Sequence, residues 1–350
     1  MKALNLYAPG DLRYEDVPTP LPKAGEALVK IHASGICGSD ISRVLEKGTY
    51  SFPTIPGHEF AGQIVTVGDD VDSSYLHKKA TVFPMLPCRK CALCQIGEYA
   101  QCTDYNYFGS RCDGGFAEYI AVPLWNIVPV PDNLSYEEAA MTEPAAVAIH
   151  ALRQAAIEMG DNVAIFGAGP IGLMLAQWAK AWGADKVMLV DIDDTKIEFA
   201  KNQGFELTYN SKYGNTAQWI KEVTAGRGAD IAVEGAGVSQ TLEGCLFCVR
   251  PFGKVVLMGN PAGEMKLSQK AYWEILRKQL KVSGTWNSNY SPLPKNEWQL
   301  AIRAMETGKI NVKPFITHRT PLSEGIKPFQ MMKDKTEFYN KVMFVMGDNT

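Results

Sequence analysis

The 350-residue chain lacks a strong charge of either sign, and it also lacks long apolar runs. Its 35 Lys and Arg nearly balance 38 Asp and Glu, which leaves a formal net charge of −3. This balance gives no electrostatic reason to expect a nucleic acid or an anionic membrane as a partner. No apolar stretch reaches the roughly 18 residues that cross a bilayer, and the N-terminal residues lack the apolar core of a signal peptide. We therefore expect a cytoplasmic protein that binds a small molecule.

Two domains are expected from the length and from a change of pattern along the chain. The first 150 residues or so carry short β-type runs, such as 27–32 and 116–122, between turn signals, which is typical of an irregular β-barrel-like domain. From residue 162 onward, apolar strands alternate with amphipathic helices, which predicts a parallel sheet covered by helices on both faces. The expected strands are 162–166, 186–190, 206–209, 229–233, 254–258 and 280–284.

A helix and a C-terminal strand complete this pattern. The helix is predicted between the first two strands, where four apolar residues recur at helical spacing along one buried side: Ile171, Leu175, Trp178 and Trp182. After residue 285 the alternation stops, and the chain ends in the strand-like run 341–346. Such a run needs a partner strand, and we expect it to return to the first domain. The predicted fold is α/β, with a β-rich domain and a Rossmann doubly wound parallel sheet of six strands.

A glycine-rich turn follows the strand 162–166 and opens this helix, with Gly167, Gly169 and Gly172 in the GxGxxG pattern. In a dinucleotide-binding turn the first glycine permits the tight turn, the second lets the backbone approach the pyrophosphate, and the third lets the helix pack closely on the strand. The pyrophosphate then lies at the helix N-terminus. Pro170 has no N–H, so the peptide of Ile171 is the expected phosphate contact.

Asp191 ends the next strand, nineteen residues after Gly172. A carboxylate at this place accepts the ribose hydroxyls of NAD and repels the 2′-phosphate of NADP. Ile192, Asp193 and Asp194 follow it, without an arginine that would neutralise such a phosphate. We therefore expect NAD as the cofactor. A glycine-rich turn in an unrelated α/β domain is the alternative interpretation.

Four of the eight cysteines are clustered: Cys88, Cys91, Cys94 and Cys102. Four thiolates within fifteen residues are enough for a closed tetrahedral zinc site, which stabilises a fold and does not catalyse. A ferredoxin-type iron–sulfur run would place its fourth cysteine after three residues and before a proline, whereas Cys102 comes after seven and precedes Thr103. Disulfides are disfavoured in a cytoplasm. Cys245 and Cys248 lie in a predicted helix, and we expect them to be ordinary buried thiols.

A catalytic metal would need a second site with an open coordination position. Its candidate ligands are scattered along the chain: Cys37 in a glycine turn, His58 next to Glu59, and Glu143 before Pro144. Taken singly, each has a plain structural explanation as a packed thiol, a hydrogen-bonded imidazole or a solvated carboxylate. The other four of the five histidines have no neighbourhood typical of a metal ligand, and we expect them to be structural.

Taken together and in order, the CGSD, GHE, four-cysteine, Glu-Pro and GAGPIG elements resemble the zinc-dependent medium-chain dehydrogenases over nearly the whole length. The resemblance implies a GroES-like catalytic domain built from residues 1–150 and 286–350. It also implies that residues 151–285 form the NAD-binding Rossmann domain. By the same analogy, the chain forms a homodimer or a homotetramer.

The resemblance also implies two zinc ions per chain, one structural and one catalytic. The catalytic zinc would be held by Cys37, His58 and Glu143, whose charges cancel that of Zn²⁺, and Glu59 would exchange with water or Glu143 as a ligand. Asp40 would hold the second nitrogen of His58. Ser39 would take the proton of the substrate hydroxyl. Zinc then acts as a Lewis acid on the alcohol, and the nicotinamide carries the hydride.

Within this family the chain is similar to the polyol dehydrogenases of the sorbitol group, for example in residues 311–319. It lacks the Arg-Tyr pair that sorbitol dehydrogenases carry after the last Rossmann strand, and it has a longer loop containing Trp286 and Trp298. This loop and residues 107–111 resemble the galactitol-1-phosphate 5-dehydrogenases, which implies oxidation of galactitol 1-phosphate to tagatose 6-phosphate. Sorbitol, xylitol, butanediol and threonine remain alternative substrates.

A polyol phosphate requires cationic or N–H groups for its phosphate. The candidates in the regions expected near the cleft are Arg43, Lys47, Arg111 and Lys295. Most lysines and arginines are merely solvated surface charges, which is the alternative interpretation for these four. A non-catalytic module that binds NAD or zinc is a remote alternative, because all the expected ligands and Ser39 are present.

Overall fold

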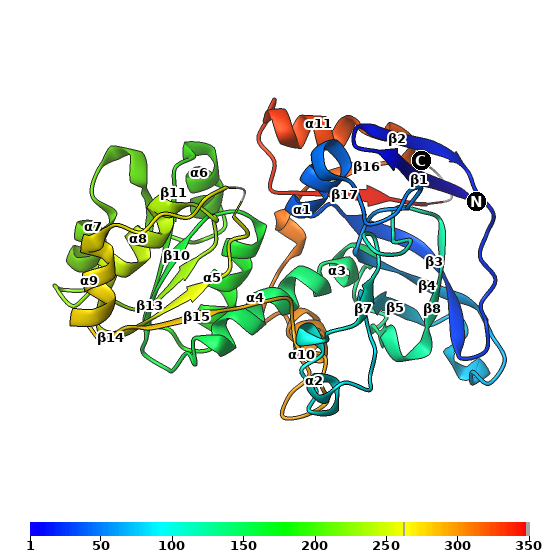
Figure 1. Cartoon of the computed structure of the whole chain (residues 1–350), viewed down its shortest axis with the longest axis horizontal. Coiled ribbons are helices and arrows are strands. Elements are labelled where there is room, and N and C mark those ends of the chain that lie inside the picture. The colour runs from blue at the N-terminus through cyan, green and yellow to red at the C-terminus, as the bar shows by residue number, and fades with distance from the viewer. Residues whose placement is uncertain (262, 348–350) are drawn as a thin grey trace. The chain divides into compact units, whose positions relative to one another are not determined.

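The computed structural model describes residues 1–261 and 263–347 (Figure 1). The chain divides into two compact units. The first unit consists of Met1–Glu143 and Asn289–Thr350, and the second of Pro144–Ser288. One boundary falls inside the helix α4 (Thr142–Gln154), which continues from one unit into the other. This boundary, between Glu143 and Pro144, lies before the expected boundary at residues 150 and 151.

The second unit contains a parallel sheet of six strands in the order β12-β11-β10-β13-β14-β15. The strands are β10 (Asn162–Phe166), β11 (Lys186–Asp191), β12 (Thr208–Asn210), β13 (Ala229–Glu234), β14 (Val249–Leu257) and β15 (Lys281–Gly284). The sequence predicted all six, but β12 begins two residues later and β14 five residues earlier than expected. The chain leaves β10 toward β11 on one side and later returns to pair β13 on the other. Ligands of open α/β sheets bind at such a switch point, outside the carboxyl ends of the strands.

Helices pack on both faces of this sheet (Figure 1). On one face, a buried core joins the strands to α7 (Thr216–Val223), α8 (Ser239–Cys248) and α9 (Gln269–Arg277). On the other, α5 (Pro170–Ala181) packs against β10 and β11. Of the four residues predicted along one buried side of α5, Leu175 and Trp178 are buried, whereas Ile171 is half-buried and Trp182 follows the end of the helix. Leu173 and Met174 are buried as well. Burial extends around most of α5 because the helix has few polar residues to place in water.

The first unit is built on a seven-stranded sheet in the order β16-β17-β3-β4-β5-β9, with β8 also paired to β3. Its strands are β3 (Glu26–Gly35), β4 (Glu59–Val67), β5 (Lys79–Val82), β8 (Tyr119–Pro123), β9 (Ile127–Pro129), β16 (Ile316–Thr320) and β17 (Lys341–Val345). β17 pairs in antiparallel fashion with β3 and in parallel with β16. The predicted return of the C-terminal run to the first part of the chain is therefore confirmed.

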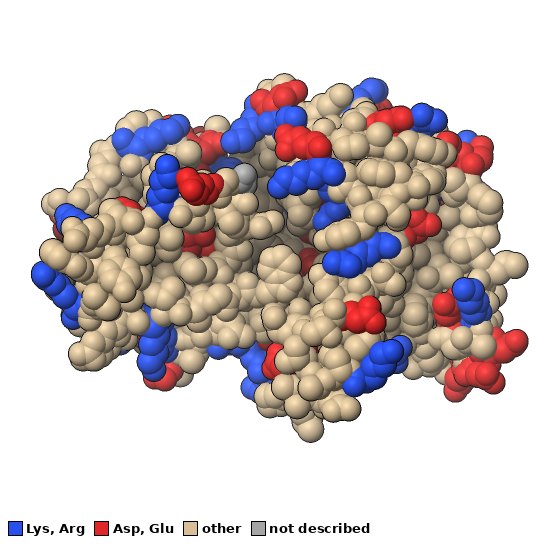
Figure 2. Space-filling view, in the orientation of Figure 1, with Lys and Arg blue, Asp and Glu red and all other residues tan. Residues whose placement is uncertain are grey.

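Shorter elements surround this sheet. They are the hairpins β1 (Lys2–Ala8) with β2 (Asp11–Asp16) and β6 (Met85–Pro87) with β7 (Tyr105–Tyr107), and the helices α1 (Gly38–Ser42), α2 (Ala92–Gln95), α3 (Tyr136–Ala140), α10 (Glu297–Glu306) and α11 (Lys327–Asp334). Across 1–261 and 263–347, no helix combines the length and apolar character that a membrane span requires. On the face drawn in Figure 2, basic and acidic side chains are interspersed over both units.

Candidate active site

Cys37 lies in the turn between β3 and α1, and the backbone holds this turn on both sides. The N–H of Ile36 donates to the carbonyl of Val342 next to β17, at 2.9 Å. The N–H of Cys37 donates to Oδ2 of Asp40 at 3.0 Å, as the N-cap of α1. The thiol therefore has a defined position at the end of a buried strand.

His58 and Glu59 stand at the start of β4 and are almost fully buried, with 5% and 1% of their surface exposed. Glu59 is the ladder partner of Gly35 on β3. A Cβ at Gly35 would lie 2.4 Å from Oε2 of Glu59, so glycine is required for the carboxylate to lie across β3. As a result, the donor atoms of Cys37, His58 and Glu59 all lie within 4.8 Å of one another.

Asp40 lies beside this cluster and is completely buried. Its Oδ1 is 3.5 Å from Nδ1 of His58 and forms an ion pair with Arg43. Burial raises the pKa of Asp40, but the positive charges of His58 and Arg43 outweigh this effect and bring the pKa to about 2. The ionised carboxylate therefore faces the second ring nitrogen of His58 and favours the tautomer that leaves Nε2 for a metal.

Lys341 is a buried residue of the site that the sequence did not reveal. It is the first residue of β17 and only 3% exposed. Its ammonium group donates to Oε2 of Glu59 and to the carbonyl of Ile36, the latter at 3.2 Å. Lys341 and Glu59 are 282 residues apart, and only the pairing of β17 with β3 brings them together. No local pattern marks this lysine, because it begins an ordinary strand-like run.

Glu143 lies near this cluster but outside the group of three donors. It lies in the first turn of α4 and is 6% exposed. The hydroxyl of Tyr107 donates to its Oε1 at 3.4 Å. The ring of Tyr107 packs edge-on against His58, with 5.6 Å between the ring centres. Burial raises the pKa of Glu143 to about 7, against the lowering effect of His58. The carboxylate grouped with the thiol and the imidazole is that of Glu59, which was expected to exchange with Glu143 as a ligand. Glu143 as a zinc ligand stays a prediction.

These residues are suitable for a catalytic zinc ion. A thiolate, an imidazole and a carboxylate are the donor types that zinc takes in catalytic sites. The carboxylates of Asp40 and Glu59 are already paired with Arg43 and Lys341. The fit to zinc therefore rests on the types of donor and on their convergence, since the donor atoms of Cys37, His58 and Glu59 lie within 4.8 Å of one another.

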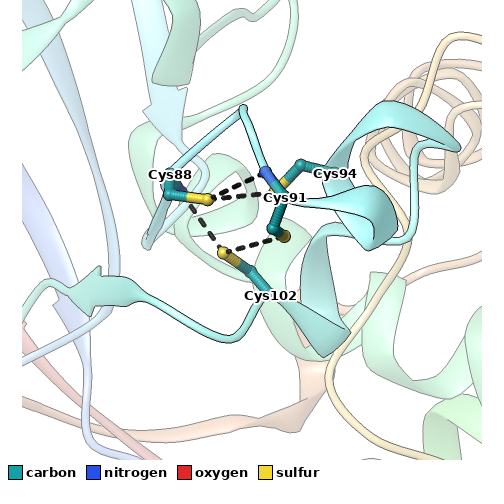
Figure 3. Close-up of side chains that lie close together, drawn as sticks. All are labelled: Cys88, Cys91, Cys94 and Cys102. Carbon is teal, nitrogen blue, oxygen red and sulfur yellow. Dashed lines mark hydrogen bonds between the residues drawn. The ribbon is translucent and has the colours of Figure 1, made fainter.

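Figure 3 shows the four-cysteine site, in which the four clustered thiols point toward a common centre. The sulfurs of Cys88, Cys91, Cys94 and Cys102 all lie within 4.8 Å of one another. The N–H of Cys88 donates to the sulfur of Cys102 at 3.3 Å, and that of Cys91 to the sulfur of Cys88 at 3.4 Å. Burial and the neighbouring thiols raise the pKa of Cys94 to about 12, whereas hydrogen bonds from backbone N–H groups lower the pKa of Cys91 to about 6. The geometry suits a closed tetrahedral site.

The glycine-rich turn between β10 and α5 has the shape that a dinucleotide requires. Gly167 has a φ of +113°, and a Cβ at Gly172 would lie 1.8 Å from the carbonyl oxygen of Gly167. In contrast, no atom lies within 4 Å of a Cβ built at Gly169, so this side of the turn is open to a pyrophosphate. Pro170 and Ile171 are the first two residues of α5.

Asp191 is fixed next to this turn by three backbone donors. Its Oδ2 accepts from the N–H of Ala168 at 2.8 Å, and its Oδ1 accepts from Ile192 and Asp193 at 2.8 and 3.0 Å. The carboxylate is therefore held at the end of β11, in contact with the glycine-rich turn. The Nζ of Lys196 lies 4.0 Å from Oδ2, a cation that the sequence interpretation did not consider.

The four candidate phosphate-binding cations differ in their surroundings. Arg43 is ion-paired with Asp40. Lys47 ends the turn Arg43–Lys47 and is exposed. Arg111 contacts two tyrosine rings. Lys295 is exposed and lies just before α10.

Comparison with known proteins places both units in described families. Residues 23–132 match the alcohol dehydrogenase GroES-like domain, and residues 170–307 match the zinc-binding dehydrogenase domain. The chain is 38% identical to galactitol 1-phosphate 5-dehydrogenase of Escherichia coli (strain K12), over 87% of this chain and 88% of the relative. It is 32% identical to sorbitol dehydrogenase of Bacillus subtilis (strain 168), over 99% and 96% of the two chains.

Solved structures show the same architecture. The crystal structure of galactitol-1-phosphate dehydrogenase from Escherichia coli superposes with a TM-score of 0.93 at 34% identity, over 99% of this chain and 100% of the other. A zinc-binding dehydrogenase from Sinorhizobium meliloti 1021 bound to NADP gives a TM-score of 0.89 at 28% identity, over 99% of each chain. The α/β fold, with a GroES-like domain and a Rossmann sheet, is therefore confirmed.

Proposed function

This chain belongs to the zinc-binding alcohol dehydrogenase family, and we propose that it oxidises a secondary alcohol of a sugar-alcohol phosphate with NAD⁺ as hydride acceptor. Family membership makes the chain a zinc-dependent polyol or alcohol dehydrogenase that acts on a small molecule, with zinc and NAD as cofactors. Galactitol 1-phosphate is the proposed substrate, and tagatose 6-phosphate is the proposed product.

The observation that carries the proposed chemistry is the buried group of Cys37, His58 and Glu59, whose donor atoms lie within 4.8 Å of one another. In our proposal Cys37 and His58 hold the catalytic zinc, and Glu59 or Glu143 supplies the carboxylate. When bound, zinc supplies Lewis acidity that lowers the pKa of the substrate hydroxyl and, in reverse, polarises the ketone. Asp40 keeps His58 in the tautomer that binds through Nε2. The four-cysteine site holds the structural zinc.

Ser39 is the proposed acceptor of the hydroxyl proton. It is exposed and lies on α1, two residues after Cys37. The reaction removes one hydride and one proton from the secondary alcohol, and the products are the ketone and NADH. NAD⁺, when bound at the second unit, would supply the hydride acceptor, and Ser39 would take up the hydroxyl proton.

The cofactor is proposed to bind at the glycine-rich turn of the second unit. The open side of Gly169 and the N–H of Ile171 receive the pyrophosphate at the start of α5. Asp191 accepts the hydroxyls of the adenosine ribose, because three backbone N–H groups hold its carboxylate beside the turn. This carboxylate disfavours a 2′-phosphate, and Lys196 weakens that discrimination only partly at 4.0 Å.

Two relatives point to different substrates. The relative at 38% identity is named for galactitol 1-phosphate, and the one at 32% for sorbitol. The first supports a phosphorylated polyol, as do the cations at Lys47 and Arg111 in the first unit. An unphosphorylated polyol is the second candidate, which the second relative supports.

The test compares kcat/KM for galactitol 1-phosphate, galactitol and sorbitol, with NADH formation as the signal. We expect kcat/KM to be at least about 100-fold higher for the phosphate ester, because several charge-assisted hydrogen bonds to a phosphate are lost with the free polyol. Equal values with and without the phosphate would reject the phosphorylated substrate and favour the free polyol.

A further inference from the structure

We infer that Arg111 binds the phosphate group of the substrate and sets the preference for a phosphorylated polyol. This inference rests on the proposed function and names the residue that confers its specificity. It makes Arg111 a specificity-determining residue, separate from the groups that hold the metal.

The guanidinium group of Arg111 is ordered by aromatic rings. Its Cζ lies 4.1 Å from the ring centre of Tyr50 and 4.5 Å from that of Tyr105. A guanidinium group that contacts aromatic rings through its charge retains five N–H donors in a planar fork. Those donors match the oxygens of a phosphate, which arginine binds in bidentate fashion.

Arg111 is half-buried and has aromatic partners but no acidic one. Among residues 1–261 and 263–347, no carboxylate lies within ion-pair distance of its guanidinium. The nearby Asp113 is committed elsewhere, since its Oδ1 accepts the N–H of Ile55 at 2.9 Å. An ordered cation without a counterion is a site for an anion.

The loop that carries Arg111 is attached to the metal-binding segment. The N–H of Arg111 donates to the carbonyl of Tyr107 at 3.0 Å, and the hydroxyl of Tyr107 lies 3.4 Å from Glu143. After Arg111, the N–H of Gly115 donates to the carbonyl of Gly57 at 2.8 Å, one residue before His58.

Close packing leaves this loop little freedom. A Cβ at Gly109 would lie 2.5 Å from the carbonyl oxygen of Gly57, and one at Gly114 would lie 2.1 Å from the same atom. Both glycines therefore let the loop lie directly on the residue before His58. The backbone that carries Arg111 is thus fixed against the segment of His58, and in our inference the guanidinium receives the phosphate end of a substrate whose alcohol lies at the zinc.

The competing cations are less suited to this role. Arg43 is already paired with Asp40, the residue beside His58. Lys47 is an exposed ammonium on a flexible stem, which provides attraction without a fixed direction. Tyr50 connects the two regions, since its N–H donates to the carbonyl of Ser110 at 3.1 Å, so Lys47 adds positive potential near Arg111.

The test measures kcat and KM of the zinc-loaded enzyme for galactitol 1-phosphate and for galactitol, in the wild type, Arg111→Gln and Arg111→Lys. For Arg111→Gln we expect KM for the phosphate ester to rise about 10- to 100-fold, because a charge-assisted pair is lost. For galactitol we expect kcat/KM to change less than about threefold. Arg111→Lys retains the charge without the planar fork, so we expect an intermediate KM.

A matched control is Arg277→Gln, which removes another ring-contacting arginine, 4.5 Å from Trp273 on α9. We expect it to leave both substrates unaffected. Zinc content and the unfolding temperature of every variant show whether the fold is intact. Equal losses for both substrates in Arg111→Gln would assign Arg111 a structural role and overturn the inference.

The two proposals fail in different ways. If the wild type prefers galactitol 1-phosphate and Arg111→Gln keeps that preference, the proposed function stands and the role of Arg111 is rejected. If the wild type itself does not distinguish the two polyols, the phosphorylated substrate is rejected and the inference falls with it. A selective loss for the phosphate ester supports both.

Discussion

Three buried carboxylates in this protein form ion pairs with cationic side chains. Asp40 pairs with Arg43, Glu59 with Lys341, and Asp230 with Arg250. Removing an ion from water is costly, and a buried pair is tolerated only while both partners and their hydrogen bonds are present. Loss of one partner therefore costs much more than loss of a surface charge.

The proposed zinc ligands give the first prediction at the scale of residues. In Cys37→Ser or His58→Ala we expect kcat/KM to fall about 10³-fold or more, because a Lewis acid contributes several kcal/mol to such a reaction. NADH binding, followed by its fluorescence, should stay within about twofold, since the glycine-rich turn belongs to the second unit. Cys245→Ala is the control, as its thiol lies outside both cysteine sites. Retained turnover in either ligand variant would reject the metal role.

Asp230 gives a prediction on stability and pH. Its Oδ2 accepts from the backbone N–H and the side-chain amide of Asn162, at 2.7 and 3.0 Å, and its Oδ1 pairs with Arg227 and Arg250. Burial raises the pKa of Asp230, but these donors outweigh it and lower the pKa below the ordinary 3.8. A lowered pKa in the folded state stabilises the fold above the unfolded-state pKa, and this contribution is lost as the pH falls through the folded-state pKa.

We therefore expect Asp230→Asn to lower the free energy of unfolding at pH 7 by about 2–4 kcal/mol. The difference from the wild type should shrink as the pH falls from about 4, the unfolded-state pKa, through the lower folded-state pKa, where the wild-type carboxyl also becomes uncharged. Urea unfolding at several pH values measures both quantities. A difference that does not change with pH would show that the charge of Asp230 contributes nothing.

At the scale of elements, β17 has two roles. It completes the sheet of the first unit between β3 and β16, and it carries Lys341 to Glu59. Its pairing begins where β3 ends, with Met343 opposite Gly35. This register places a residue from the end of the chain beside Cys37 at its beginning. On the other side of β3, the antiparallel ladder with β4 aligns Gly35 with Glu59.

Substitution of Lys341 tests this role of β17. Lys341→Met leaves the carboxylate of Glu59 buried without its counterion, so we expect the free energy of unfolding to fall by about 3–5 kcal/mol. The double variant Lys341→Met with Glu59→Gln removes both charges and should recover much of this loss. Urea unfolding of the single and double variants gives the coupling energy. A double variant as unstable as the sum of the singles would contradict the ion pair.

At the scale of the whole molecule, the chain combines one unit for the nucleotide with one that contains both groups of proposed metal ligands. The first unit is assembled from two separate stretches of the chain, Met1–Glu143 and Asn289–Thr350. The four-cysteine site is contained in the first stretch, whereas the group of Cys37, His58 and Glu59 is supported by Lys341 from the second. The site of Cys37, His58 and Glu59 therefore requires both stretches to pack together, whereas all four ligands of the four-cysteine site come from one stretch.

The two groups of proposed metal ligands predict the zinc content of the chain. We expect about two zinc ions per chain in the wild type and about one in Cys94→Ser, because a closed structural site requires all four thiolates. The unfolding temperature of this variant should fall by several degrees, since structural zinc contributes folding free energy. Elemental analysis and a thermal melt are the measurements, with Cys245→Ala as the control. Two zinc ions in Cys94→Ser would contradict the structural site.

Features that depend on residues close in the sequence could be predicted without the tertiary structure. The six parallel strands, the glycine-rich turn with Asp191, and the four cysteines within fifteen residues all depend on neighbours close in the sequence. Hydrophobic periodicity and motif spacing are properties of a short segment, so these features were predictable from the chain alone. The boundaries were less accurate, because a helix such as α4 continues across the point where one unit ends and the other begins.

Long-range pairing decided the rest. Cys37, His58 and Glu59 were scattered candidates until the β3–β4 ladder brought their donor atoms together, and Glu143, expected as a ligand with Glu59 as its exchange partner, lies outside that group. Nothing local distinguishes Lys341 from other strand residues, or Arg111 from the remaining cations. Which side chains meet depends on strand register and on the close approach of backbones, and both are set only when distant segments pack against each other.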